Sequence, residues 1–222
     1  MSRVLFVHPR KVTSENPVPH LGLASLARRL LDSGHEVLIL DEAFLSEGSV
    51  PPLTQVIESF APDVIGFSVY TATLDSTLEY IRRARESSSA AILAGGPHAT
   101  LFPQQLATSG VVDCVVRGEA EDAIVRVVEA ARRAETCQVV RAPAVDVKSL
   151  PWPDYTHFVG WESITIYPVN TSRGCPFDCS FCAVAQITSR QWRARDPEDC
   201  VAEVAAARRL LPALLCMIAI TL

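Results

Sequence analysis

The sequence lacks the features that mark proteins of membranes, nucleic acids and the cell exterior. No stretch reaches the roughly 18 to 20 apolar residues that a membrane span requires. The N-terminal segment MSRVLFVHPRK is interrupted too early by polar residues for a secretory signal. The net charge of −5 gives no electrostatic footprint for nucleic acid or for an anionic membrane surface. We therefore expect a cytoplasmic protein with no membrane span and no nucleic-acid partner.

The cysteines do not suit a disulfide framework, because there are seven of them and because thiols are kept reduced in the cytoplasm. Three of them, Cys175, Cys179 and Cys182, fall close together in the stretch NTSRGCPFDCSFCAV. The other four are scattered, and we interpret each as a small buried or incidental residue: Cys114, Cys137, Cys200 and Cys216.

The front part of the chain alternates short apolar runs with helical patterns. The runs predict strands at 4–7, 37–40, 64–69, 90–96 and 113–119, and the patterns between them predict helices at 21–34, 53–60, 73–87, 102–110 and 120–134. Strands that are apolar on both faces indicate a parallel sheet covered by helices on both sides. We predict an α/β fold with a flavodoxin-like doubly wound parallel sheet. Its ligands would lie beyond the carboxyl ends of the strands, at 8–10, 70–73, 95–100 and 117–121.

The segment after residue 137 changes character. Residues 138–162 contain three prolines and no sustained helical or strand period, which indicates an ordered linker that docks Trp152 and Tyr155 onto an apolar surface. A new strand is predicted at 163–170, followed by the three cysteines and by a helix with Asp196 as its cap and Pro197 in its first turn. A strand, loop and helix in this order are typical of a β/α barrel. We predict a front domain at 1–137, a linker at 138–162 and an incomplete TIM-like barrel domain at 163–222.

Three thiolates on one tight loop can hold three corners of an iron–sulfur cubane and leave one iron open. Gly174 and Pro176 suit a loop that wraps a cluster, and Phe177 and Phe181 would form an apolar shell around it. Two alternatives stay open at this point. One is a zinc site completed by a distant ligand such as His157 or Cys200, and the other is three loop thiols that bind no metal.

The cysteine segment TSRGCPFDCSFC resembles the radical S-adenosylmethionine (SAM) enzymes. The front part is similar to the cobalamin-binding domain that precedes the radical domain in one large branch, which includes anaerobic magnesium-protoporphyrin ester cyclases and many methyltransferases. The segments that carry this similarity are PHLGLASLARRLLDSGHEVLILD, GGPHAT and VVRGEAE.

The resemblance implies a mechanism. Cys175, Cys179 and Cys182 would ligate a [4Fe–4S] cluster whose open iron is chelated by S-adenosylmethionine. An electron donor such as flavodoxin or ferredoxin would reduce the cluster. Cleavage of S-adenosylmethionine would then give a 5′-deoxyadenosyl radical that attacks a C–H bond of a small-molecule substrate. Cobalamin would assist methyl transfer, cyclisation or related chemistry.

The resemblance also implies which residues contact the cofactors. We expect cofactor contacts from His8, Thr71, Thr73, Gly95, Gly96, His98, Gly118, Glu119 and Phe181. The D-x-H-x-x-G motif of many cobalamin domains is absent, so a histidine of that motif does not ligate cobalt here. Among the histidines we place His98 nearest to the ligand. Glu119 and Glu121 either contact polar cofactor groups or begin a helix, where acidic residues are favoured.

The chain contains only the first β/α unit of a radical domain, whereas a closed TIM-like barrel needs several more. We therefore expect the front part of a longer enzyme, with poor packing in its last part and impaired or absent activity on its own. Two further classes remain as alternatives. One is a non-catalytic module that binds cobalamin or a nucleotide, and the other is a zinc-stabilised scaffold.

Overall fold

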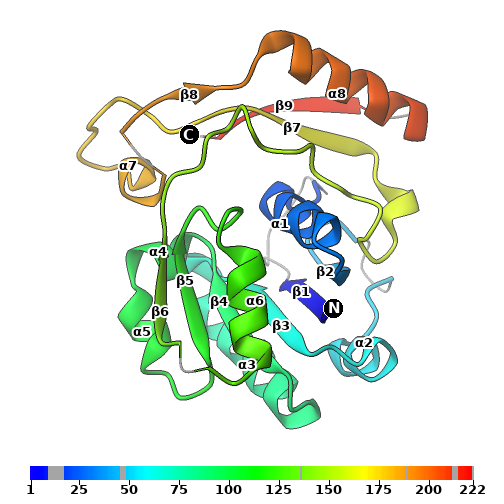
Figure 1. The fold of residues 1–222 in the computed structure, drawn as a ribbon, viewed down its shortest axis with the longest axis vertical. Helices are drawn as coiled ribbons and strands as arrows, with labels where there is room; N and C mark the ends of the chain where they lie inside the picture. Colours follow the sequence, from blue (N-terminus) through cyan, green and yellow to red (C-terminus); the bar gives the residue numbers. More distant parts are fainter. Residues whose placement is uncertain (10–17, 46–48, 136, 189, 212–214, 222) are drawn as a thin grey trace.

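The computed structural model describes residues 1–9, 18–45, 49–135, 137–188, 190–211 and 215–221. In this part of the chain the larger sheet has six parallel strands in the order β2-β1-β3-β4-β5-β6 (Figure 1). Its strands are β1 (Arg3–His8), β2 (Glu36–Asp41), β3 (Val64–Ser68), β4 (Ala91–Gly95), β5 (Cys114–Gly118) and β6 (Val139–Ala142). The order of the first five strands is the flavodoxin-like order.

Helices cover both faces of this sheet. On one face lie α1 (Leu21–Asp32) and α6 (Ile124–Arg132). On the other face lie α2 (Leu53–Phe60), α3 (Leu74–Ser87), α4 (Pro97–Leu101) and α5 (Pro103–Ala107). All five residues of β3 are buried, which explains why the strands are apolar runs without alternation. The predicted doubly wound α/β fold is confirmed.

A smaller sheet lies across the carboxyl ends of the larger one (Figure 1). Its strand order in the described residues is β8-β7-β9, with β7 parallel to β9 and antiparallel to β8. Its strands are β7 (Ile166–Arg173), β8 (Arg193–Ala194) and β9 (Leu215–Thr221). The helices of this part are α7 (Val184–Ile187) and α8 (Pro197–Leu210), and α8 packs on β7.

Several elements differ from the prediction. Strand β7 begins and ends three residues later than expected, so that it runs through Arg173 directly into the cysteine segment. Strand β6 was not expected, because its sequence shows no strand period, yet it pairs with β5 from Val115–Val139 to Gly118–Ala142. The helix predicted at 102–110 is present as the shorter α5, whereas α4, which ends just before Phe102, was not expected. Pro103 begins α5, because proline fits the first turn of a helix but lacks an N–H to continue one.

Cys114 and Cys137, which we interpreted as separate incidental thiols, are joined by a disulfide. The two residues meet because β5 and β6 are neighbours in the sheet, and their Cα atoms lie 5.1 Å apart. That interpretation is therefore wrong for this pair. Cys200 is a free buried thiol on α8, as expected.

The segment between the two sheets docks as predicted. Tyr155 is buried, and its hydroxyl donates to the carbonyl oxygen of Pro168 on β7 at 2.9 Å. Phe158 pairs with Ile39 at the edge of the larger sheet. Trp152 is half-buried, and its indole N–H donates to Asp199 of α8 at 2.8 Å. The segment thus ties both sheets together.

Packing in the last part is uneven. Most residues of β7 are buried, whereas only three of the fourteen residues of α8 are: Cys200, Glu203 and Ala207. The expectation of poor packing is therefore wrong for β7, although α8 is largely exposed. Asp196 stands at the start of α8 as predicted, but its carboxylate accepts from Lys148 at 2.9 Å and makes no cap hydrogen bond.

Gly118 is expected to be intolerant of a side chain. Its φ is +98°, and a Cβ there would overlap the carbonyl oxygen of Ala142 in the neighbouring strand. We expect Gly118→Ala to lower the free energy of unfolding in urea by about 2 kcal/mol or more beyond the strain of positive φ alone. Gly110→Ala is the matched control, because its φ of +74° carries the same strain and nothing lies within 4 Å. Equal losses in the two variants would contradict this packing.

Candidate cofactor site

A cavity of about 480 Å³ lies where the strands of the larger sheet end. The carboxyl ends of β1, β3, β4 and β5 form its floor, the start of α1 forms one wall, and Pro168, Asn170 and Arg173 of β7 form another. The lining is mainly apolar and includes Leu23 and Val116. A cavity of this size, with a few polar groups in an apolar lining, is typical of small-molecule and cofactor sites.

The cavity brings together part of the predicted set. His8, Gly95, Gly96, Gly118 and Glu119 line it. Thr71, Thr73 and His98 do not belong to its lining, nor does Phe181. His98 is buried beside it, with Nδ1 3.0 Å from the hydroxyl of Thr71. The histidine that we placed nearest to the ligand therefore lies behind the cavity wall.

His8 and Asp41 form a buried pair at the ends of β1 and β2. The two residues are register partners, so parallel pairing places their side chains together. Nδ1 of His8 lies 2.8 Å from Oδ1 of Asp41, which is completely buried. Asp41 also accepts from the backbone N–H groups of His20 at 2.8 Å and Ala43 at 3.1 Å. These donors fix the carboxylate, and the carboxylate fixes the imidazole.

His20 is a site residue that sequence reasoning missed. It caps α1, where its Nδ1 accepts from the N–H of Leu23 at 3.2 Å. Its Nε2 lies 2.9 Å from the hydroxyl of Ser68 and 3.2 Å from that of Tyr70. The only sequence signal was its position just before the apolar run LGLASL. His20 lines the cavity, and its ring lies edge-on to that of His8 at 4.7 Å between centroids.

Burial raises the pKa of Tyr70, and the negative charge of Asp41 raises it further. The phenol therefore stays neutral at physiological pH. Tyr70 lines the cavity between β3 and α3, and its ring lies 5.5 Å from that of His8. His8, His20 and Tyr70 thus form one aromatic cluster at the cavity wall.

A second cluster joins the two sheets and consists of Glu119, Glu121, Arg173 and Arg193, here called the inter-sheet ion cluster. Arg173, the last residue of β7, donates to Oε1 of Glu121 at 2.5 Å. Arg193 of β8 binds both carboxylate oxygens of Glu119, at 2.5 and 2.9 Å. All four side chains are at most 17% exposed.

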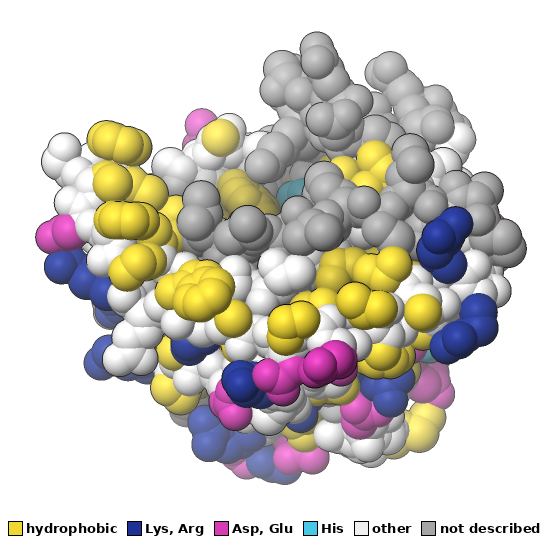
Figure 2. All heavy atoms as spheres, turned by 90° about the horizontal axis from the view of Figure 1, so that it is seen from above, with side chains coloured by type: hydrophobic (Ala, Val, Ile, Leu, Met, Phe, Trp, Pro, Cys, Tyr) yellow, Lys and Arg dark blue, Asp and Glu magenta, His cyan; other side chains and the backbone are white. Residues whose placement is uncertain are grey.

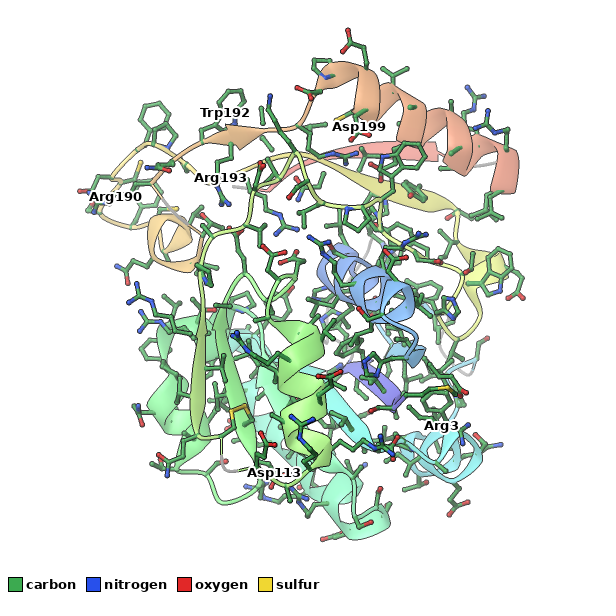
Figure 3. All side chains as sticks on the ribbon, in the orientation of Figure 1. Arg3, Asp113, Arg190, Trp192, Arg193 and Asp199 are labelled. Carbon is green, nitrogen blue, oxygen red and sulfur yellow. A yellow bond between two sulfur atoms is a disulfide. The ribbon has the colours of Figure 1, made fainter. Side chains whose placement is uncertain are left out.

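Figure 3 shows Arg193 facing the larger sheet, while Trp192 beside it points to the other side. Sequence reasoning assigned the two glutamates to a cofactor or to a helix start. In the structure they bind arginines of the smaller sheet, and Glu119 also lines the cavity.

Electrostatics keep Glu119 charged. Burial of its side chain acts to raise the pKa of Glu119. Hydrogen bonds from Arg193 and from the N–H of Val145, together with the charge of Arg173, outweigh burial and hold that pKa below its ordinary value. The carboxylate therefore remains ionised well into the acidic range.

The cysteine segment leaves β7 through Gly174, whose φ is +86°. Cys175 and Cys182 are half-buried, Cys179 is exposed, and all three are free thiols. A turn brings the N–H of Cys182 to the carbonyl oxygen of Cys179 at 3.0 Å. Three free thiols on one segment match the donor set of an iron–sulfur cluster. Among the described residues, no group of three His, Cys, Asp or Glu side chains is arranged to hold a metal ion.

The apolar shell predicted from Phe177 and Phe181 is not closed, because these side chains are 70% and 90% exposed. Figure 2 shows hydrophobic side chains at the left end of the upper face, where Figure 1 places α7 and the cysteine segment. Trp192 is also exposed. The cysteine segment therefore has an apolar outer surface.

The fold and the cavity together define a doubly wound domain with a cofactor-sized cavity at the carboxyl ends of its strands. The chain belongs to the B12-binding domain family, whose pattern matches residues 7–128, more than half of the chain. None of the helices in the described residues is long and apolar enough to cross a membrane.

Curated relatives extend the similarity beyond the B12-binding domain. An anaerobic magnesium-protoporphyrin IX monomethyl ester cyclase of Rubrivivax gelatinosus is 28% identical, over 91% of this chain and 42% of its own. An uncharacterised methyltransferase of Pyrococcus horikoshii is 26% identical, over 84% of this chain and 45% of its own. The hopanoid C-3 methylase of Methylococcus capsulatus is 27% identical, over 80% and 38%. The chain spans less than half the length of these relatives.

Solved structures share the fold. The radical S-adenosylmethionine methyltransferase TsrM of Kitasatospora setae, solved with tryptophan and a SAM analogue, has a TM-score of 0.74 at 19% identity, over 98% of this chain and 47% of its own. OxsB, a cobalamin-dependent S-adenosylmethionine radical enzyme solved with aqua-cobalamin and S-adenosylmethionine, has a TM-score of 0.72 at 18% identity, over 98% and 34%. At these identities the similarity shows the fold alone.

The ion pairs of Glu119 are expected to make stability depend on acid pH. Because the pKa of Glu119 is lowered by folding, its stabilising effect is complete above the ordinary carboxyl pKa and is lost as the pH falls below it. We expect Glu119→Gln to lower the free energy of unfolding at neutral pH by about 1 to 3 kcal/mol. In urea unfolding at decreasing pH, the difference in free energy of unfolding between Glu119→Gln and wild type should become smaller.

The matched control for this variant is Glu162→Gln, an exposed carboxylate at the surface. Its unfolding curve should follow wild type at every pH. If the loss in free energy of unfolding of Glu119→Gln stays constant down to acid pH, the shape of the side chain and not its charge determines the effect of the substitution.

Proposed function

We propose that this chain carries the cobalamin-binding part and the cluster-binding segment of a radical S-adenosylmethionine enzyme of the methyltransferase or cyclase type. One observation carries the proposal: the strand that walls the cavity, β7, leads directly into the cysteine segment. A single strand thus links a cofactor-sized cavity in a B12-binding domain to three free thiols. OxsB, which shares the fold, is a cobalamin-dependent S-adenosylmethionine radical enzyme and supports the pairing of these two cofactors.

The residues of the cavity suit a large cofactor. Gly95 leaves open space at the floor, since a Cβ there would meet nothing closer than the Val116 carbonyl oxygen at 3.9 Å. The lining is mainly apolar, and His8 supplies a nitrogen with no partner in the described residues. We assign the cobalamin contacts to His8, Gly95, Gly96 and Gly118.

We assign the cluster to Cys175, Cys179 and Cys182. When bound, the cluster with S-adenosylmethionine would supply one-electron cleavage and hydrogen abstraction, and cobalamin would supply methyl transfer or assist a cyclisation. The task of this chain is to place these groups near each other. The inter-sheet ion cluster does so, because Arg173 stands two residues before Cys175 and its guanidinium is held by Glu121 beside the cavity.

The proposal extends to the setting of the enzyme. It includes a small-molecule substrate, an electron donor such as flavodoxin or ferredoxin, and a cytoplasmic location. The domain limits at 1–137, 138–162 and 163–222 belong to it as well. A nucleotide-binding module and a zinc-stabilised scaffold are the outcomes that would replace it.

Cobalamin retention tests the cavity. We expect the 222-residue chain mixed with hydroxocobalamin to co-elute with it on gel filtration, and Gly95→Leu to weaken binding at least about tenfold, because the new side chain enters the cavity. Gly110→Leu is the control, because a Cβ at Gly110 meets nothing within 4 Å and the residue lies outside the cavity lining. Cobalamin that elutes separately while a nucleotide is retained would contradict the proposal.

Anaerobic reconstitution with iron and sulfide tests the cysteine segment. We expect about four irons and four sulfides per chain and a broad visible absorption that dithionite bleaches. Both should be lost when Cys175, Cys179 and Cys182 are changed to serine. Cys200→Ser, which removes a free buried thiol on α8, should leave both intact. A colourless protein that contains one zinc would support the scaffold instead.

A further inference from the structure

His8 lines the cavity with an imidazole nitrogen that no group in the described part of the chain satisfies. The residue is 7% exposed, and Nε2 is buried without a hydrogen-bond partner in the described part of the chain. Buried polar atoms are nearly always paired, because an unpaired one costs free energy. An unpaired nitrogen in the lining of a cofactor-sized cavity therefore points to the cofactor as its partner.

Asp41 determines what this nitrogen can do. An ionised carboxylate only accepts hydrogen bonds, so the 2.8 Å contact requires Nδ1 of His8 to carry a proton. In the neutral imidazole, Nε2 then presents a lone pair. Histidines that bind metals in proteins characteristically donate their other N–H to a carboxylate, which fixes the tautomer and the ring orientation. His8 and Asp41 have this arrangement.

The other histidines of this region do not share it. Both nitrogens of His20 are engaged, Nδ1 by the N–H of Leu23 and Nε2 by Ser68 and Tyr70. His98 does not line the cavity, and its Nδ1 faces a hydroxyl that sets no tautomer.

We propose that Nε2 of His8 is the protein ligand to the cobalt of cobalamin bound in this cavity, with Asp41 as the positioning residue. This inference rests on the proposed function. The bond is dative, in which the lone pair of Nε2 replaces a water molecule or the cofactor's own base at one axial position. No proton or electron moves, because Nδ1 keeps its proton. The end of β1 thereby supplies an axial histidine without the D-x-H-x-x-G motif.

Electron paramagnetic resonance tests the assignment. The 222-residue chain is produced with ¹⁵N only in histidine, loaded with natural-abundance cobalamin, and reduced by one electron without oxygen. A protein histidine on cobalt splits each cobalt line into a doublet, whereas the cofactor's own ¹⁴N base gives a triplet. We expect the doublet in wild type. A triplet, or no nitrogen splitting, would overturn the assignment even if cobalamin is retained.

Variants then identify the residue. The doublet should vanish in His8→Ala and His8→Gln and persist in His98→Ala, whose histidine lies outside the cavity lining. His8→Gln serves if His8→Ala does not fold, because its amide can still donate to Asp41. Should neither fold, loss of the doublet in His20→Gln overturns the assignment and its retention supports it.

A doublet that survives in a folded His8 variant would also overturn the assignment. Free cobalamin in the wild-type experiment is a different failure, because it removes the proposed function together with this inference.

Discussion

The arrangement of this protein depends on four charged side chains between its two sheets, each at most 17% exposed. Glu119 and Glu121 follow β5, whereas Arg173 and Arg193 belong to β7 and β8. Burying charges is costly, and the cost is offset only when every charge is paired with good geometry. The bidentate contact between Arg193 and Glu119 and the contact between Arg173 and Glu121 meet this condition. Removal of one partner would leave a largely buried charge unpaired. The cluster therefore fixes the position of the smaller sheet relative to the larger one.

The position of the cofactor cavity follows from this arrangement of the two sheets. Parallel strands end on one side of a sheet, and their ends leave backbone groups and a hollow for a ligand. The smaller sheet covers this hollow, because Pro168 and Asn170 reach the cavity from β7 while Arg173 is held at its rim. The cysteine segment begins beyond Gly174, so its distance from the cavity is set by a fixed strand. A B12-binding domain and three free thiols thus become neighbours through one ion cluster.

The sequence predicted what local pattern determines. Apolar runs such as VLFV and DVIGFSV predicted the central strands, and the glycine after α1 predicted where that helix ends. The local pattern did not predict β6, because its four residues form a half-buried edge strand whose partner, β5, is distant in sequence. It could not give the disulfide of Cys114 and Cys137 for the same reason.

The same limit applied to the candidate site. The cysteine spacing and the strand-end segments were readable, and five of the expected residues line the cavity. The site roles of His20 and of the arginine partners of Glu119 and Glu121 could not be predicted, because these residues belong to elements distant in sequence from the residues that they contact. The contact of Asp41 with His8 was not predicted either, since only the register of β1 with β2 brings the two residues together.

The central claim is that the cavity between the strand ends and β7 is the cobalamin site. Difference hydrogen–deuterium exchange, with and without hydroxocobalamin, tests it most directly. The account predicts slower exchange at the strand ends, in 66–70, 93–97 and 116–120, and together with them in 168–173 of β7. Protection confined to the outer edge around β2 and α2, or unchanged exchange in 168–173, would contradict it.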